Sequence, residues 1–230
     1  NLNAIVLGIK GGDNTFNHAH YDLGSFILEA NGERWIVDSG VEKETYQRHR
    51  NKLPHWAFYR VRAEGHNTLV LNPASASKGP DQEAKGKAPI TEFSSGPDGA
   101  RAVMDLSTAY AGNAKSVRRT FDLADKRSAV IVSDSIIAEK PADLWWFAHT
   151  KADVKVASDG RSAILSRKGK TLTVRVESPA RARLGVMDAR PLPSSPNPDI
   201  QEKNEGRRKL FIHLAAVARL DLRVRFTPGR

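Results

Sequence analysis

The sequence predicts an all-β fold, a large antiparallel β-sandwich (super-sandwich) with little helix. From residue 101 onward, apolar and polar residues alternate in short segments, which is the period of a half-buried strand. Turn-forming residues separate these segments at the spacing typical of β-sandwiches, as at 158–160 and 168–170. No long amphipathic helical pattern and no repeat of solenoid period interrupts the series.

The individual elements follow from the same signals. Residues 41–58 predict a loop or short helix, 73–100 long loops around a short strand near 88–93, and 188–206, with four prolines, a long loop. The strands expected after residue 100 are 101–110, 115–123, 127–137, 143–150, 153–157, 162–166, 170–178, 182–187, 207–216 and 220–227.

Size and composition are those of an ordinary globular domain, and we interpret residues 1–230 as one domain. Hydrophobic residues make up 40% and charged residues 27% of the chain. Cysteine is absent, which excludes a disulfide framework. No apolar run reaches the length of a membrane span and no signal peptide is visible, so we expect no membrane partner. Because the chain opens at Asn1 without an initiator methionine, we expect it to be a fragment or a processed product of a longer polypeptide.

The chain is strongly basic. Its 36 Lys and Arg residues against 26 Asp and Glu give a formal net charge of +10, which attracts polyanions. On charge alone, both nucleic acids and acidic polysaccharides are possible partners. The basic residues are mostly dispersed, and no RNA-binding signature or helix-turn-helix pattern is present. We therefore expect no nucleic-acid partner.

A hairpin is predicted around Asn31-Gly32, the strongest short-range turn signal, which lies between two apolar runs. The register of a two-residue turn pairs Glu29 with Arg34, Leu28 with Trp35, Phe26 with Val37 and Ser25 with Asp38. Asp38 then returns beside the start of the hairpin, but an unbroken strand would place His20 on the opposite face. A bulge or bend at Gly24, a loop around His20, or a three-residue turn would each remove the conflict.

Three histidines near this hairpin are candidate functional residues. In extended backbone, His18 and His20 would point the same way, so one could hold a metal while the other reaches a substrate. His66 follows a glycine at the head of an apolar, β-branched run. One histidine of this pair, together with His66 and Asp38 and with a fourth position open, would form a plausible zinc ligand set. The alternatives are a solvated histidine pair near a turn and a capped loop histidine.

Several blocks of the sequence resemble the C-terminal region of heparinase II/III-like proteins, a group of polysaccharide lyases. The specific blocks are 10–14, 17–26 (Asn-His-Ala-His-Tyr-Asp-Leu-Gly-Ser-Phe), 32–35, 37–40 and 62–70 (Arg-Ala-Glu-Gly-His-Asn-Thr-Leu-Val). Weaker similarity continues through 105–107, 118–121 and 145–150, so the resemblance covers most of the chain. It implies β-elimination on uronate-containing acidic polysaccharides, either glycosaminoglycan-like or alginate-like.

The resemblance also implies roles for particular residues. His18 would be catalytic, as base or as partner of the substrate carboxylate. One metal ion, usually zinc and structural, would be held by His20, Asp38 and His66. We expect Asn17, Tyr21 and His149 to bind substrate, the alternative for His149 being a satisfied core histidine.

The tyrosine and asparagine that complete the active site in these proteins lie in an N-terminal α/α toroid. The resemblance therefore implies a toroid of the same polypeptide as the partner of this chain, which would carry half of an active site. Export to the periplasm or outside the cell is expected from the substrate class. A non-catalytic polyanion-binding or structural β-sandwich module is the alternative function.

Overall fold

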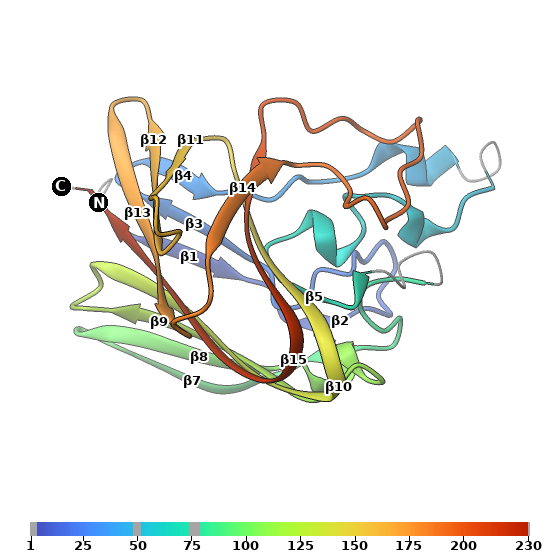
Figure 1. The fold of residues 1–230 in the computed structure, drawn as a ribbon, viewed down its shortest axis with the longest axis horizontal. Coiled ribbons are helices and arrows are strands. Elements are labelled where there is room, and N and C mark those ends of the chain that lie inside the picture. Colours follow the sequence, from blue (N-terminus) through green and yellow to red (C-terminus); the bar gives the residue numbers. More distant parts are fainter. Residues whose placement is uncertain (1–3, 48–51, 74–78, 230) are drawn as a thin grey trace.

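The computed structural model describes residues 4–47, 52–73 and 79–229, and most of this part of the chain is strand (Figure 1). The strands are β1 (Val6–Ile9), β2 (Gly12–Asp13), β3 (Phe26–Ala30), β4 (Glu33–Ile36), β5 (Leu69–Leu71), β6 (Lys87–Ala88), β7 (Ile90–Gly96), β8 (Gly99–Asp105), β9 (Ala114–Ala124), β10 (Ala129–Thr150), β11 (Asp153–Val156), β12 (Ser162–Arg167), β13 (Lys170–Ser178), β14 (Leu184–Asp188) and β15 (Arg208–Pro228).

In the part of the chain that the structure describes, helix is limited to short 3-10 turns. These are η1 (Lys43–Gln47), η2 (His55–Ala57), η3 (Ala63–Gly65) and η5 (Ser107–Tyr110). Within the described ranges, no helix is long and apolar enough to pass through a bilayer. The prediction of short helix or loop over residues 41–58 is thus confirmed for the described part of that segment, while residues 48–51 lie outside it.

The strands form one large and two small sheets, and the paired strands are antiparallel. The ten-stranded sheet has the order β11-β12-β13-β15-β10-β9-β8-β7, with β14 added to β15 and β5 added to β10. The small sheets are β1-β3-β4 and β2-β6. The predicted all-β antiparallel fold is confirmed, and residues 189–207 form the expected long loop between β14 and β15.

Two strands are much longer than the sequence predicts. The sequence predicted separate strands over 127–137 and 143–150, and over 207–216 and 220–227. Both separations are wrong, because β10 and β15 each continue through the gap. The β10–β15 register shifts between Ile137 and Ala142 and again before Leu144. Pro141 lacks a backbone N–H and is accommodated at this irregularity, where a ladder bond is already lost. The bent pair then exchanges neighbours: β10 pairs first with β9 and later with β5, while β15 pairs with β14 and then β13.

The β3–β4 hairpin differs from its predicted register by one bulge. Glu29 pairs with Arg34 as expected, but Leu28 lies opposite Ile36 instead of Trp35. Trp35 has no partner residue in this register, and its indole N–H donates to the carbonyl oxygen of Ala30 at 3.0 Å. Because the bulge interrupts the alternation, three successive residues, 35–37, are all buried.

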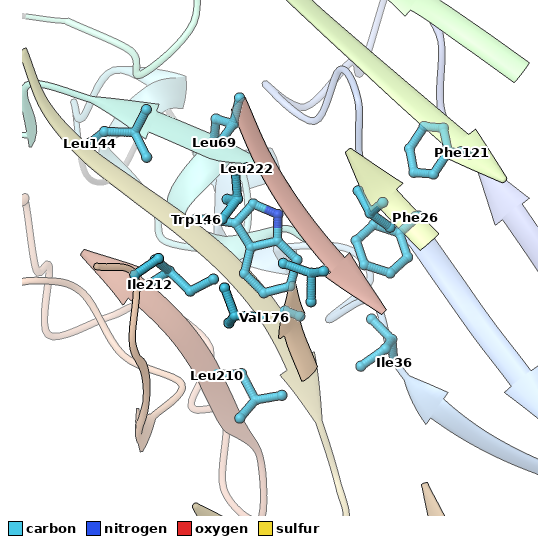
Figure 2. Packing of buried hydrophobic residues seen from close by; sticks show 14 of the residues in the cluster. Phe26, Ile36, Leu69, Phe121, Leu144, Trp146, Val176, Leu210, Ile212 and Leu222 are labelled. Atoms are coloured by element: carbon cyan, nitrogen blue, oxygen red, sulfur yellow. The ribbon is translucent and has the colours of Figure 1, made fainter. Parts of the chain in front are cut away.

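The sheet β1-β3-β4 packs against the curved face of the large sheet, and one aromatic cluster joins them (Figures 1 and 2). The ring of Phe26 in β3 lies 5.9 Å from Phe121, 6.4 Å from Trp146 and 5.7 Å from Phe226, between centroids. Trp145 stacks with Phe147 on the other side of β10. Residues 145–147 therefore pack on both faces of the sheet.

Replacing Phe26 with alanine should lower the free energy of unfolding by about 3–5 kcal/mol, because the side chain is only 2% exposed and fills the centre of this cluster. Urea unfolding followed by tryptophan fluorescence measures the loss. Phe93→Ala is the matched control, since that side chain is 73% exposed on β7 and its removal should change stability by less than about 0.5 kcal/mol. Equal losses in the two variants would contradict the packing described here.

Candidate functional site

Three residues that are distant in sequence meet beside the β3–β4 hairpin. The Nδ1 atom of His66 lies 2.8 Å from Oδ2 of Asp38, and its Nε2 atom lies 3.3 Å from Nδ1 of His20. His66 follows η3, Asp38 follows β4, and His20 lies in the loop that precedes β3. The sequence-predicted ligand set is thus assembled as a continuous series, Asp38–His66–His20.

The side chain of Asn67 explains why these segments meet. Its amide group donates to the carbonyl oxygens of Phe26 at 2.7 Å and Val37 at 2.9 Å, while its oxygen accepts from the backbone N–H of His149 at 2.6 Å. Since Asp38 follows Val37 and His66 precedes Asn67, the Asn67–Val37 bond brings the carboxylate next to the imidazole. Buried backbone groups are almost always hydrogen-bonded, and the Asn67 side chain supplies a partner to these three.

The loop that carries His20 is tied to the same segment. The hydroxyl of Thr68 donates to the carbonyl oxygen of Leu23 at 2.9 Å, and the backbone N–H of Asn67 donates to the hydroxyl of Ser25 at 3.1 Å. The backbone N–H of Tyr21 donates to the carbonyl oxygen of Val61 at 2.8 Å. His20 therefore lies in a loop held before the strand, which is one of the three alternatives that the sequence left open.

A buried ion pair supports both loops from the large sheet. Arg119 in β9 and Asp134 in β10 are fully buried and joined by two hydrogen bonds of 2.6 and 2.9 Å. The remaining guanidinium donors reach the carbonyl oxygens of Gly24 at 2.7 Å and Asn67 at 3.0 Å. One side chain thus anchors the segments that precede β3 and follow His66.

The electrostatics of the series favour a neutral His20. Burial, followed by the charge of His66, lowers the pKa of His20 to about 4. Burial alone would lower the pKa of His66, but the charge and hydrogen bond of Asp38 raise it overall. Burial would raise the pKa of Asp38, whose side chain is 38% exposed, yet His66 and the Gly40 N–H hold it below its usual value. His20 therefore keeps a lone pair available at neutral pH.

The geometry of the two imidazoles fits a metal ion. Ligand nitrogens about 2.0–2.1 Å from a tetrahedral zinc lie roughly 3.3 Å apart, which matches the separation between His20 and His66. Asp38 bonds the far nitrogen of His66, the position in which a carboxylate orients a ligating imidazole. Among the described residues, no three histidine or acidic side chains surround a common point as a complete metal site would require.

The first histidine of the pair has a different environment from the second. His18 has a left-handed backbone with φ of 62° and an exposed side chain, and its ring lies 5.5 Å from that of Tyr46. The assumption of extended backbone through 18–20 is therefore wrong, because a turn occupies 17–18. Asn17 is exposed in that turn, and Tyr21 is half-buried beside His20 in sequence.

His149 lies behind the site, not at its surface. It is fully buried; its Nε2 atom lies 2.7 Å from the hydroxyl of Tyr59 and its Nδ1 atom 3.0 Å from the oxygen of Asn67. Because that oxygen can only accept, Nδ1 carries the proton and the Tyr59 hydroxyl donates to Nε2. This burial does not fit the expected contact with substrate and matches the alternative of a satisfied core histidine.

Comparison with known proteins agrees with this architecture. The model of the heparinase II/III-like C-terminal domain matches residues 3–210. The chain belongs to this family. No curated protein matches the sequence significantly.

Solved structures of heparinases share the fold of this heparinase II/III-like domain. Heparan sulfate lyase HepC from Pedobacter heparinus is 17% identical, with a TM-score of 0.72 over 98% of this chain and 33% of that one. A heparinase III structure is 14% identical, with a TM-score of 0.71 over 99% of this chain and 33% of the other. A further heparinase III gives 16% identity and a TM-score of 0.61, over 93% and 30%. The chain thus spans about a third of the length of these proteins.

The domain also contains site residues that sequence analysis did not select. One is His55, whose ring lies 6.4 Å from that of His20. A groove of about 280 Å³ adjoins the series and is lined by Lys10, Asp22 and Asp38, with Lys10 and Asp22 paired at 2.8 Å. The side chains of Tyr59 and Asn67 carried no sequence signal, because only their hydrogen bonds reveal their role.

Burial, followed by the charge of Lys209, holds the pKa of His149 well below its usual value, so this residue should stay neutral in the folded heparinase-like domain where a free histidine begins to be protonated. Below about pH 6.5 the unfolded chain binds a proton at this residue and the folded protein does not. Above that pH the residue therefore adds no pH dependence to the free energy of unfolding. Below it, the free energy of unfolding falls by up to about 1.4 kcal/mol for each unit of decreasing pH. Imidazole ¹⁵N shifts should show the neutral Nδ1–H tautomer at about pH 6, and a protonated His149 at that pH would contradict the assignment.

Proposed function

We propose that this domain forms one wall of the active site of a polysaccharide lyase that cleaves uronate-containing acidic polysaccharides, either glycosaminoglycan-like or alginate-like, by β-elimination. The observation that carries the proposal is the Asp38–His66–His20 series, with bonds of 2.8 and 3.3 Å, directly beside the exposed loop that presents His18. Membership of the heparinase II/III-like family gives this arrangement its chemical context.

The reaction requires a base, an acid and a group that neutralises the uronate carboxylate. The base removes the proton from C5, the electron pair of that bond forms the C4–C5 double bond, and the bond from C4 to the leaving oxygen breaks. The leaving oxygen then takes a proton from the acid. Because the negative carboxylate makes the C5 proton poorly acidic, a positive or hydrogen-bonding partner for it lowers the barrier.

The residues of the domain suit complementary parts of this task. His18 is exposed and can reach a polymer, so we assign it the role of base or carboxylate partner. Asn17 and Tyr21 flank the two histidines and are proposed substrate contacts. His20 and His66 would hold a zinc ion, with Asp38 completing the set or orienting His66, and the ion would brace this wall of the site.

Completion of the site requires groups from elsewhere. The chain spans about a third of the length of the heparinase structures it resembles, and we propose that an N-terminal α/α toroid of the same polypeptide supplies the remaining acid and base groups. Acidic polysaccharides are large extracellular polymers, so we propose that the protein works in the periplasm or outside the cell.

A second candidate function is a polyanion-binding module without catalysis. The net charge of +10 favours it, since such a surface attracts acidic glycans without a metal or a catalytic histidine. Metal content and turnover separate the two functions.

One zinc ion per chain should bind to the purified domain, and His20→Ala should weaken binding at least tenfold by removing one of two imidazoles that lie 3.3 Å apart. Isothermal titration with Zn²⁺ alone measures the affinity. His213→Ala is the control, because it removes an imidazole that stacks on Trp145 in β10, away from the series. Metal-free protein with salt-sensitive glycan binding would favour the second candidate function.

His18→Ala should reduce lyase turnover by the full-length polypeptide at least a hundredfold, consistent with the loss of a general base or carboxylate partner. The unsaturated product is followed by its ultraviolet absorbance. Since the His18 side chain is exposed, the thermal unfolding midpoint should change little. Unchanged turnover in this variant would show that the domain is a structural module. Full turnover by the isolated domain would contradict the proposed need for a toroid.

A further inference from the structure

The long loop between β14 and β15, residues 189–207, is fixed to the segment that carries His66. Glu64 is fully buried and accepts hydrogen bonds from the backbone N–H of Leu192, from the hydroxyl of Ser195 at 2.5 Å and from the ammonium group of Lys209 at 3.0 Å. Glu64 stands two residues before His66. The first part of the loop is therefore anchored in the same core as the candidate site.

The second part of the loop has its own anchors on that segment. The guanidinium group of Arg60 donates to the side-chain oxygen of Asn204 at 2.9 Å and to the carbonyl oxygen of Lys203 at 2.8 Å. The backbone N–H of Tyr59 donates to the side chain of Gln201 at 3.0 Å. These bonds hold the loop as an ordered wall next to residues 59–66.

The anchored loop encloses a cavity. Its volume is about 640 Å³, within the range of about 300–1,000 Å³ that is usual for small-ligand sites. Its lining includes the basic residues Arg190, Lys203 and Arg207, together with Gln201 and Asn204, which bond Tyr59 and Arg60. A cavity of this size with basic side chains in its lining has room for a sugar unit with a negative substituent.

Arg207 is the unusual residue of this lining. Its side chain is half-buried and its Nε atom is buried without a hydrogen-bond partner. No hydrogen bond or ion pair joins the guanidinium group to another residue in the described part of the chain. Burial, followed by the charge of Arg60, lowers its pKa, while the charge of Asp38 acts in the opposite direction. Arg207 therefore lies within electrostatic range of the candidate site and lacks a counter-ion.

The carboxylates of the lining do not supply that counter-ion. Asp188 pairs with Arg208 at 3.4 Å, and Glu202 lies 3.7 Å from Lys43 and 3.9 Å from Arg60. The other two carboxylates of the lining, Asp199 and Glu205, are exposed to solvent. A partly desolvated guanidinium beside a second positive charge is destabilised, and a bound anion would relieve this.

We propose that Arg207 binds the carboxylate or sulfate group of an acidic sugar unit in the cavity lined by the β14–β15 loop, which is anchored to the segment that precedes His66. The inference takes its ligand class from the proposed function. It adds a specificity-determining residue that lies outside the histidine motifs. Arginine suits this role because its planar donors bind carboxylate and sulfate groups in a bidentate manner.

The test is direct binding of two hexasaccharides, one from alginate with carboxylates only and one from heparan sulfate with both groups, to the 230-residue domain in about 0.15 M salt. Arg207→Ala should weaken binding of at least one probe tenfold or more, and Arg207→Lys should give an intermediate loss. Arg219→Ala is the matched control, because it removes the same charge from an exposed position on β15 and should change affinity less than twofold. Circular dichroism verifies that each variant is folded.

The pattern of losses identifies the bound group. A loss for both probes indicates recognition of the carboxylate, and a loss for heparan sulfate alone indicates the sulfate; both support the proposal. Absence of binding by the wild type, an unchanged affinity in Arg207→Ala, or an equal loss in Arg219→Ala overturns it. Lyase turnover of the full-length polypeptide is scored separately. If the domain needs Arg207 for binding but the full-length polypeptide shows no turnover, the lyase function alone is refuted. If the full-length polypeptide turns over substrate independently of Arg207, this inference alone is refuted.

Discussion

The structure depends above all on the hydrogen bonds of one buried amide, the side chain of Asn67. It holds the carbonyl oxygens of Phe26 and Val37 and the backbone of His149, and so joins β3, the end of β4 and β10 at one point. Each of these groups would be costly to bury alone, so the junction is stable only when all bonds form together. Because His66 and Asp38 are the chain neighbours of this junction, their contact is a consequence of how the fold satisfies its backbone.

Buried charges extend this junction outward in two directions. Arg119 and Asp134 connect it to the large sheet, while Glu64 and Lys209 connect it to the loop over residues 189–207. Lys209 also lies over the rings of Tyr59 and Phe147, at 5.0 and 4.4 Å from their centroids. Buried ion pairs of this kind add little net stability compared with apolar packing, but losing one partner is costly. Their value here is geometric, since they fix two loops and a β-strand in one relative position.

Sequence reasoning predicted the architecture well because alternation and turn residues report directly on half-buried strands. It failed where a local rule was overridden by pairing. Pro141 signalled a turn, yet an irregular position in β10 tolerates the missing N–H, and the bulge at Trp35 shifted the hairpin register without any glycine or proline to mark it. The ligand set was selected largely through family resemblance. The burial of His149 could not be predicted, because alternation does not distinguish a covered sheet face from an open one.

Arg207 could not be selected from the sequence either, because it belongs to no motif. Only the structure shows that its guanidinium group lacks a partner among the residues it describes and that the loop around it is anchored. The two histidines of the motif show the complementary case, since their spacing alone does not say which one would hold a metal and which would reach a substrate. His20 is half-buried, neutral and in contact with His66, which suits a ligand or a fixed acceptor. His18 is exposed on a left-handed turn and free of that series, which suits a group that must meet an incoming polymer. The environment of an imidazole, more than its spacing from a neighbour, determines what it can do. In the proposed mechanism, the turn at 17–18 therefore distinguishes the structural role of His20 from the catalytic role of His18.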